Sequence, residues 1–520
     1  MGKTLAQLLA ALPEDTILRV TGEDNAVITS PVVEADSDIL PGGVFVARKG
    51  LSVDGHDFIG RALERGAVAV VGEHNLSDLT VPYVQVNDSQ AVVGLLAAVY
   101  HDFPSRKLIV VGVTGTDGKT TTSHLIHGIL QAATQNRSGL ISTIEADLGA
   151  STETTGLHVT TPGAPQVQEY LAQMVENGLT HCVLEMTSHG LAQGRLNGVD
   201  IDIAVLTNVT HEHLDYHGSW EEYRAAKAIM FEMLVTAYRK PDQPKIAVIN
   251  HDDPSADFFA AIPADKVIRY GLSEAADCQA TTIEYGPGRT QFRLTYDGVE
   301  RPQIFDTRFF GEFNVLNCLA ALGVGFAFAT ATEHMVEGLR RVEAISGRME
   351  RIDEGQDFTA IVDFAHTPNA LRRALEAGRQ ILAPGKRLIA VFGSAGLRDV
   401  EKRRMMAEVS AQLADVTVLT AEDPRTESLD DILQMMAEGC IRQGGVEGKT
   451  FIRVPDRGQA LYRACQMAEP GDIVMACGKG HAQSMCFGII EYDWDDREAL
   501  RAALRGTPLR TLPTAPEAES

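Results

Sequence analysis

The 520-residue sequence lacks several features that would place it in familiar classes. No stretch approaches the roughly 18 continuous apolar residues that a membrane-spanning helix needs. The seven cysteines are scattered, odd in number and without a Cys-x-x-Cys pair, which favours reduced thiols over a disulfide framework or a zinc site. The N-terminal segment has too short an apolar run for a signal peptide. We therefore expect a cytoplasmic protein with no membrane partner.

Basic residues are also scarce relative to acidic ones. The chain holds 46 Lys and Arg residues against 70 Asp and Glu residues, a formal net charge of −24 at pH 7. Proteins that bind nucleic acid hold its phosphates with an excess of Lys and Arg, so this balance excludes a general nucleic-acid binder. An anionic substrate must therefore meet locally placed cations. The hydrophobic fraction of 44% is ordinary and allows sizeable cores.

The length of the chain suggests about three domains of roughly 150 residues each. Residues 1–105 predict a small N-terminal α/β domain, with strands near 44–47 and 67–71 and a helix near 58–65. The proline in Phe103-Pro104-Ser105 interrupts two periodic segments and predicts a linker there.

Two further α/β domains are predicted after this linker. Residues 106–345 alternate buried strands with helices, which predicts a mainly parallel sheet of the P-loop ATPase type. Residues 346–505 repeat the alternation in a smaller, Rossmann-like doubly wound sheet. The tail, residues 506–520, has no periodicity and is expected to be disordered. The fold class is thus α/β with three domains.

The segment KLIVVGVTGTDGKTTT, residues 107–122, carries the most chemical information. A buried strand leads into a glycine-bearing turn and then into a helical pattern, which is typical of a phosphate cradle. Lys119 can reach the terminal phosphates of a nucleoside triphosphate, and Thr120 can ligate Mg²⁺. The common P-loop has a glycine where this chain has Val113. The residues expected to hold ATP in this loop are Gly115, Thr116, Asp117, Gly118, Lys119, Thr120 and Thr121.

Two further segments of the central domain carry possible metal ligands. Glu185 ends a predicted buried strand, where ligands of parallel sheets collect, and could bind Mg²⁺ beside Thr120; alternatively, it caps the next helix. Residues 207–217 contain three histidines and two carboxylates, which raises the possibility of zinc. The segment does not match the His-Glu-x-x-His helix of metalloproteases, so one histidine that assists a second Mg²⁺ is favoured. Lys227 would by default be an exposed helix lysine.

The order of these motifs resembles the Mur ligases, which are ATP-dependent amide-bond-forming enzymes of peptidoglycan synthesis. Within this family, the chain is most similar to the branch that adds the third residue of the peptide. The similarity covers nearly everything from about residue 40 to 490. The matching motifs are GVTGTDGKTTT, Thr160-Thr-Pro162, Glu185-Met-Thr-Ser-His-Gly190, Thr207-Asn208, Glu212-His-Leu-Asp-Tyr-His-Gly218, Ala226-Lys227, Phe313-Asn-Val-Leu-Asn317, Gly347-Arg-Met-Glu350 and Asp363-Phe-Ala-His-Thr-Pro368.

The resemblance implies roles for residues of all three domains. Lys119, Glu185, His213 and Lys227 would be catalytic, and two Mg²⁺ ions would be held by Thr120, Glu185, His213 and Lys227, the last as a carbamate formed with CO₂. The further nucleotide contacts would be Asn317, Arg348 and Asp363. The UDP-muramoyl-peptide would be held by Thr160, Thr161, Thr187, Gln193 and Arg195. The incoming amino acid would be held by Arg398, Asp423, Arg425, Gly478 and Ala482.

The chain departs from the family pattern in its first domain, in its phosphate loop and in its amino-acid pocket. The family has Asp-Ser-Arg where this chain has Ala35-Asp36-Ser37, and an asparagine where it has Asp117. Diaminopimelate-type enzymes carry Asp-Asn-Pro-Arg and Gly-Lys-Gly-His-Glu, whereas this chain has Glu422-Asp-Pro-Arg425 and ends the second motif with Ala482. Arg425 could pair with a distal carboxylate, whereas Asp423 could meet a distal ammonium. Diaminopimelate, lysine and ornithine therefore all stay open.

The resemblance implies an ATP-dependent acid–amino-acid ligase that forms ADP and phosphate. It would add a diamino acid (meso-diaminopimelate, lysine or ornithine) to UDP-N-acetylmuramoyl-L-alanyl-D-glutamate through an acyl phosphate. The alternative is a related amide ligase that acts on another carboxylate acceptor, such as a folate-like or cofactor precursor. We expect the enzyme to be a monomer.

Overall fold

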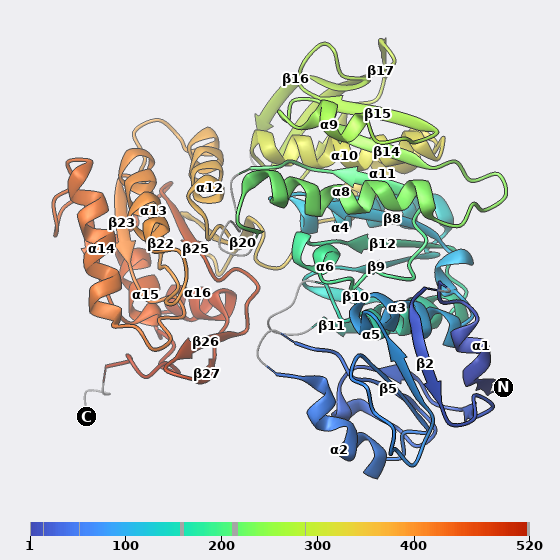
Figure 1. Cartoon of the computed structure of the whole chain (residues 1–520). Helices are drawn as coiled ribbons and strands as arrows, with labels where there is room; N and C mark the ends of the chain where they lie inside the picture. The colour runs from blue at the N-terminus through green and yellow to red at the C-terminus, as the bar shows by residue number, and fades with distance from the viewer. Residues whose placement is uncertain are drawn as a thin grey trace. The chain divides into compact units, whose positions relative to one another are not determined.

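The computed structural model describes residues 2–13, 15–50, 53–155, 161–210, 217–286 and 288–516. The chain forms two compact units, one of Met1–Tyr270 with Ala320–Ala331 and the other of Gly271–Leu319 with Thr332–Ser520 (Figure 1). Within the described residues, the structure contains no helix long and apolar enough to cross a membrane.

The first unit begins with a five-stranded sheet in the order β2-β7-β6-β5-β4. The strands β4 to β7 are parallel, and β2 pairs antiparallel at the edge. Apolar side chains of α1 and α3 pack on one face of this sheet. The elements are β1 (Lys3–Thr4), α1 (Leu5–Leu9), β2 (Ile17–Thr21), β3 (Val27–Ile28), β4 (Val32–Val33), β5 (Val44–Val46), α2 (Ile59–Glu64), β6 (Ala69–Gly72), β7 (Tyr83–Val86) and α3 (Ser89–Tyr100).

The larger sheet of the first unit has the order β11-β10-β9-β12-β8-β13-β14-β15. The strands from β9 to β15 are parallel, and β10 and β11 continue antiparallel. Its strands are β8 (Ile109–Thr114), β9 (Ser138–Ile141), β10 (Glu145–Asp147), β11 (Thr152–Thr154), β12 (His181–Glu185), β13 (Ile203–Leu206), β14 (Ile246–Asn250) and β15 (Lys266–Gly271). Its helices are α4 (Lys119–Thr134), α5 (Ala164–Glu176), α6 (Ser188–Ala192), α8 (Trp220–Thr236) and α9 (Ala256–Ala260).

The strands of this sheet are nearly continuous apolar runs because both faces are covered. Every residue of β13 and β14 is buried. One apolar core joins strand residues such as Val110 and Leu184 to residues of α5 and α8. The register places Glu185 of β12 opposite Val113 of β8, so both strands end at the same edge.

The second unit contains antiparallel strands and a separate parallel sheet. The antiparallel strands are β16 (Cys278–Gly286), β17 (Arg289–Tyr296), β18 (Val299–Glu300) and β19 (Phe305–Thr307). Two helices accompany them, α10 (Glu312–Ala327), whose last residues belong to the first unit, and α11 (Thr332–Arg341).

The parallel sheet has the order β20-β21-β25-β22-β23-β24, with only β20 antiparallel. Its strands are β20 (Glu350–Ile352), β21 (Thr359–Asp363), β22 (Leu388–Phe392), β23 (Val416–Leu419), β24 (Phe451–Arg453) and β25 (Ile473–Cys477). The helices are α12 (Pro368–Ile381), α13 (Val400–Leu413), α14 (Leu429–Arg442), α15 (Arg457–Met467) and α16 (Asp496–Leu504), and a hairpin is formed by β26 (Ser484–Phe487) and β27 (Ile490–Asp493).

Helices cover both faces of this sheet, as the sequence predicted. Leu388 and Phe392 of β22 pack into a core with α12, α13 and α14. The alternate residues Ile389 and Val391 pack into a second core with α15 and α16. This alternation follows from the two-residue period of a strand.

The prediction of a disordered tail is wrong for the part of it that is described. Leu512 is only 4% exposed and belongs to the core beneath α15 and α16. Thr514 Oγ1 donates a 3.0 Å hydrogen bond to Asp456 Oδ2. A Cβ at Gly458 would lie 2.2 Å from the Leu509 carbonyl oxygen, so the chain passes directly over this glycine. Apolar packing and one side-chain hydrogen bond therefore hold a segment that has no sequence periodicity.

Candidate active site

The phosphate loop lies between β8 and α4 of the first unit. Gly115 has φ +150°, and a Cβ there would lie 1.8 Å from Thr207 Oγ1, so only glycine fits. Gly118 has φ +81° and precedes α4 without offering a capping side chain. The first N–H groups of a helix can then bind an anion. The helix starts at Lys119, directly after Gly118.

Lys119 folds back over this loop. Its Nζ donates to the carbonyl oxygens of Gly115, at 3.1 Å, and Thr116, at 2.8 Å. The Asp117 backbone N–H is held by Asn208 Oδ1 at 3.0 Å, and Thr207 Oγ1 donates to the Asp117 carbonyl at 2.7 Å. The loop is therefore fixed from the end of β13 before any ligand binds.

Thr120 and Glu185 meet at the start of α4, as expected from the ends of their strands. Thr120 Oγ1 donates to Glu185 Oε1 at 3.2 Å, and the Thr143 N–H donates to Glu185 Oε2 at 3.0 Å. Glu185 is 1% exposed and Thr120 3% exposed. The alternative that Glu185 caps the next helix is wrong, because the cap of α6 is Thr187, whose side chain accepts from the Gly190 N–H.

Lys227 lies beside the same loop and is not an exposed lysine, which was the default reading of its helix. It is 1% exposed, and its Nζ donates a 2.6 Å hydrogen bond to the Gly115 carbonyl. The ammonium also lies over the Tyr223 ring, 4.3 Å from its centroid, and the Tyr223 hydroxyl donates to Thr116 Oγ1 at 3.0 Å. One turn of α8 therefore contacts the loop twice.

Four of the residues expected to hold the UDP-substrate form one hydrogen-bonded group. Arg195 donates to the Thr161 carbonyl at 2.8 Å and to Gln193 Oε1 at 2.7 Å. The hydroxyls of Thr161 and Thr187 are 3.1 Å apart. Two expected site residues, Thr160 and His213, lie outside the described residues.

The residues of the second unit that are expected to contact the nucleotide lie in two regions, one around β20 and β21 and the other in α10. Asp363 ends β21, where its carboxylate accepts from the N–H groups of Met349 and Ala365, both at 2.8 Å. The Arg348 guanidinium lies 4.5 Å from the centroid of the Phe364 ring, so the turn before β20 is joined to the end of β21. Asn317, in α10, donates to Asn314 Oδ1 at 3.0 Å.

The residues expected at the amino acid lie at the carboxyl ends of β22, β23 and β25. Arg398 is exposed and Arg425 is partly buried. Asp423 Oδ1 accepts from Lys479 Nζ at 2.9 Å and from the Cys486 N–H at 3.0 Å. Its charge is therefore already paired, which the sequence did not reveal. Gly478 has φ +110°, and Ala482 follows on the same loop.

Glu422 is the residue of this group that sequence reasoning left without a role. It is 8% exposed, and its Oε2 has no hydrogen-bond partner within the described part of the chain. Burial raises the pKa of its carboxyl to about 7. A Cβ at Gly478 would lie 2.5 Å from Oε2, so a bare glycine is needed beside this carboxylate. The contact joins residues that are 56 positions apart in the sequence. The only signal for it was the motif Gly-Lys-Gly-His, which begins at Gly478.

A separate cluster in the first unit joins Asp54, His56 and His74. His56 Nδ1 is 2.6 Å from Asp54 Oδ1, while its Nε2 accepts from the Glu73 N–H at 2.9 Å. The Nδ1 atom must therefore carry the proton, and neither ring nitrogen is free to bind a metal. This arrangement supports the local fold.

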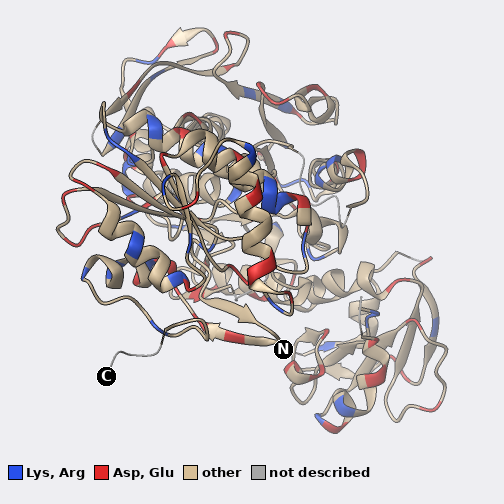
Figure 2. Ribbon diagram, turned by 90° about the vertical axis from the view of Figure 1, so that its left-hand side faces the viewer, with Lys and Arg blue, Asp and Glu red and all other residues tan. Residues whose placement is uncertain are grey.

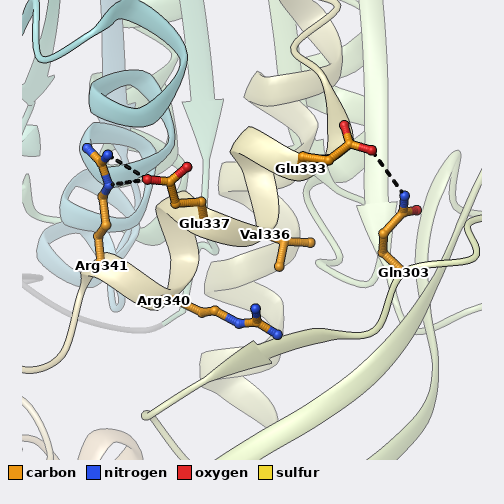
Figure 3. A pocket seen from close by; sticks show the side chains of 6 residues that line it. All are labelled: Gln303, Glu333, Val336, Glu337, Arg340 and Arg341. Atoms are coloured by element: carbon orange, nitrogen blue, oxygen red, sulfur yellow. Dashed lines mark hydrogen bonds and ion pairs between the residues drawn. The ribbon is translucent and has the colours of Figure 1, made fainter.

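The second unit also has a pocket of about 440 Å³ on α11, lined by Gln303, Glu333, Val336, Glu337, Arg340 and Arg341 (Figure 3). Glu337 pairs with Arg341 at 2.6 Å, and Arg340 pairs with Asp306 at 2.5 Å. None of the lining residues is an expected site residue, and the charges of Glu337, Arg340 and Arg341 are paired. Charged residues of both signs are interspersed along the helices in the view of Figure 2.

A phosphate loop at the edge of a parallel sheet, followed by a doubly wound sheet, defines a nucleotide-dependent α/β enzyme. Three family models match consecutive parts of the chain: "Mur ligase family, catalytic domain" over residues 37–101, "Mur ligase middle domain" over 113–325 and "Mur ligase, glutamate ligase domain" over 347–480. The UDP-N-acetylmuramoyl-L-alanyl-D-glutamate–2,6-diaminopimelate ligase of Geobacillus thermodenitrificans is 40% identical over 507 residues, covering 96% of this chain and 99% of the relative.

The UDP-N-acetylmuramyl-tripeptide synthetase of a Roseiflexus species is 41% identical over 484 residues, covering 91% of this chain and 94% of that relative. A solved structure of a UDP-N-acetylmuramoyl-L-alanyl-D-glutamate–2,6-diaminopimelate ligase has a TM-score of 0.64 at 28% identity and covers 97% of this chain and 99% of its own. The chain belongs to the Mur ligase family. The predicted three-domain α/β fold and ATP-dependent ligase class are confirmed, whereas the exact domain boundaries stay predictions.

Proposed function

We propose that this enzyme adds a diamino acid to UDP-N-acetylmuramoyl-L-alanyl-D-glutamate, with ATP converted to ADP and phosphate, in peptidoglycan synthesis. The names of the relatives support the acceptor. The structural observation that carries the proposal is the pair of Thr120 and Glu185 at the phosphate loop. A carboxylate that is 1% exposed and receives one hydroxyl and one N–H needs a cation to offset its charge.

Magnesium fits this donor set, because Mg²⁺ prefers carboxylate and hydroxyl oxygens together with substrate phosphates. We assign one ion to Thr120 and Glu185, and a second to Glu185, His213 and Lys227. A bound Mg²⁺ would offset the negative charge that builds up when a carboxylate approaches a phosphoryl group.

The surroundings of Lys227 fit a carbamate. Carbamylation replaces the ammonium by an anionic group that can bind a metal, yet the nitrogen keeps one N–H. That N–H can still donate to the Gly115 carbonyl, which now accepts from Lys227 Nζ at 2.6 Å. We therefore propose Lys227 as the carbamylated residue.

The chemistry requires activation of a poor electrophile. A carboxylate oxygen of the acceptor attacks the γ-phosphorus of ATP, and ADP leaves. The amine nitrogen of the amino acid then attacks the carbonyl carbon of the acyl phosphate, loses a proton, and phosphate departs with the former carboxylate oxygen. Lys119 Nζ is held over the loop by two carbonyls, which supports its proposed role in binding the transferred phosphoryl group. Asn317, Arg348 and Asp363 are assigned to the nucleotide.

We propose meso-diaminopimelate as the first candidate among the diamino acids. The relatives' names include this amino acid, and Arg398 and Arg425 supply two guanidinium groups for carboxylates. Lysine and ornithine stayed open because Asp423 could meet a distal ammonium, but Lys479 Nζ already pairs with Asp423 at 2.9 Å. Diaminopimelate, lysine and ornithine all carry a distal ammonium, so this pair does not separate them, whereas only diaminopimelate has a second carboxylate for a second guanidinium.

An assay of phosphate release tests the proposal. The protein is supplied with ATP, Mg²⁺, UDP-N-acetylmuramoyl-L-alanyl-D-glutamate and one of meso-diaminopimelate, lysine or ornithine. Release that depends on both the acceptor and a diamino acid supports the proposal. Release only with a folate-like or other acceptor would support the alternative instead. The cytoplasmic location and the monomeric state stay predictions.

A further inference from the structure

Arg403 is a fully buried arginine beneath the loops that carry Arg398 and Arg425. The residue, in the first turns of α13, is 0% exposed. Its guanidinium donates to Glu427 at 2.8–2.9 Å and more weakly to the Ala395 carbonyl at 3.4 Å. Burying a guanidinium is costly unless it is paired, so Glu427 is required by Arg403.

Glu427 links Arg403 to the loop that carries Arg398. Its Oε1 also accepts from the backbone N–H of Leu397, the neighbour of Arg398. Glu427 itself lies two residues after Arg425, in the turn that follows β23. These hydrogen bonds lower the pKa of the Glu427 carboxyl, first through the Leu397 N–H and then through Arg403, so the carboxylate stays ionised.

The backbones of the two loops also contact each other directly. The Gly396 N–H donates to the Asp423 carbonyl at 2.9 Å, and a Cβ at Gly396 would lie 2.0 Å from the Pro424 carbonyl oxygen. The hairpin of β26 and β27 also contacts the loop that carries Arg425, because the Arg425 N–H donates to the Cys486 carbonyl at 3.0 Å. Backbone contacts therefore join the two loops to each other and to the hairpin.

Three non-glycine residues in these loops have left-handed backbones. Leu397 has φ +56°, Asp423 +38° and Arg425 +54°. Such conformations cost free energy and persist where the surrounding structure over-determines them, which is most frequent at ligand sites. Leu397 directly precedes Arg398, and Arg425 is itself one of the two arginines assigned to the amino acid.

We infer that the Arg403–Glu427 ion pair is a positioning pair that sets the separation of the Arg398 and Arg425 guanidiniums, and thereby selects an amino acid with two carboxylates. The inference rests on the proposed function. Arg403 and Glu427 would not contact the amino acid; they act through the loop backbones. Two guanidiniums carried by joined loops favour a dicarboxylate over a monocarboxylate because both carboxylate charges are then paired.

The test compares meso-diaminopimelate with L-lysine, which has one carboxylate fewer. Glu427→Asp keeps the charge but shortens the side chain, so that it cannot reach Leu397 and Arg403 together. Arg403→Met removes the buried charge with an apolar side chain of similar length, which avoids leaving an unpaired buried cation. For both variants we expect the ratio of kcat/KM for diaminopimelate over lysine to fall at least tenfold, with the KM for ATP within about twofold of the unmodified protein.

The matched control is the ion pair of Arg387 and Asp472. These residues directly precede β22 and β25, so they lie at the amino ends of the strands, away from the amino-acid loops. Arg387 donates to Asp472 Oδ2 at 2.8 Å, and Asp472 is 1% exposed. Asp472→Asn should lower the melting temperature without changing the ratio. Variants of Arg403 and Glu427 that melt as folded proteins and keep the ratio would overturn the inference.

The outcomes separate this inference from the proposed function. A protein that forms no amide with any diamino acid contradicts both. A protein that uses lysine but not diaminopimelate stays a ligase, and the positioning of two guanidiniums for two carboxylates is then wrong. A protein that prefers diaminopimelate, and loses the preference only in the Arg403 and Glu427 variants, supports both.

Discussion

Lys227 Nζ donates a 2.6 Å hydrogen bond to the carbonyl of Gly115, which ties helix α8 to the phosphate loop. The contact joins residues 112 positions apart, and both are buried or confined by close packing. A lysine in this position is therefore part of the site and not of the surface. Its replacement should affect chemistry more than folding.

We expect Lys227→Ala to abolish turnover, and short carboxylic acids such as acetate to restore part of it without bicarbonate. The added carboxylate would occupy the place of the carbamate. The measurement is phosphate release as a function of acid concentration. Lys227→Met is the matched control for lost packing and should be rescued less, because its side chain fills the space. A fully active alanine variant would remove the carbamate assignment.

Glu185→Gln should lower kcat by a factor of 100 or more and raise the Mg²⁺ concentration needed for half-maximal rate. The amide keeps the contact with Thr120 Oγ1 but lacks the charge that offsets a metal ion. Removing a buried charge should leave the melting temperature unchanged or higher. A magnesium titration of the rate checks the first statement. An unchanged magnesium requirement in the variant speaks against Glu185 as a ligand.

Arg425→Ala should raise the KM for the amino acid at least tenfold and leave the KM for ATP nearly unchanged. The guanidinium is assigned to a carboxylate of the amino acid, whereas the turn itself is held by backbone hydrogen bonds to the β26–β27 hairpin. The two KM values are measured on the same preparation. Equal effects on both would mean that the turn has only a structural role.

The stability of the C-terminal sheet should depend on pH through Glu422. Its pKa rises from 4.5 in the unfolded chain to about 7 when folded, because burial disfavours the ionised form. A raised carboxyl pKa stabilises the folded state below pH 4.5, and this contribution is lost as the pH rises towards 7. The loss is on the order of 3 kcal/mol, from about 1.4 kcal/mol per pKa unit.

Glu422→Gln should therefore be more stable than the unmodified protein at pH 8 and similar to it at pH 5. Denaturant unfolding at the two pH values provides the comparison. Asp430→Asn, at an exposed position of α14, is the control and should not change the pH dependence. A variant with the same pH dependence as the parent would show that Glu422 is ionised in the folded protein.

The sequence predicted elements best where local signals were strong. A proline followed by regularly spaced apolar residues favours a helix, and α5 accordingly begins at Ala164, beside Pro165, and continues to Glu176. The meeting of Thr120 and Glu185 was also predicted, since parallel strands end at one edge of the sheet.

Contacts across the chain were not predictable in the same way. The pairing of Lys479 with Asp423 and the approach of Glu422 to Gly478 depend on two backbone loops that meet with left-handed residues. Neither periodicity nor composition encodes that geometry. The packing of Leu512 likewise depends on a core that residues of α15 and α16 form from distant parts of the sequence.

The most direct test of the account follows oxygen through the reaction. The acceptor is prepared with ¹⁸O in the carboxylate that forms the amide, and the protein is supplied with unlabelled ATP and a diamino acid. The account predicts that one ¹⁸O atom appears in each phosphate released, because the acyl phosphate loses that oxygen to phosphorus. Phosphate free of label, released at the rate of amide formation, would contradict it.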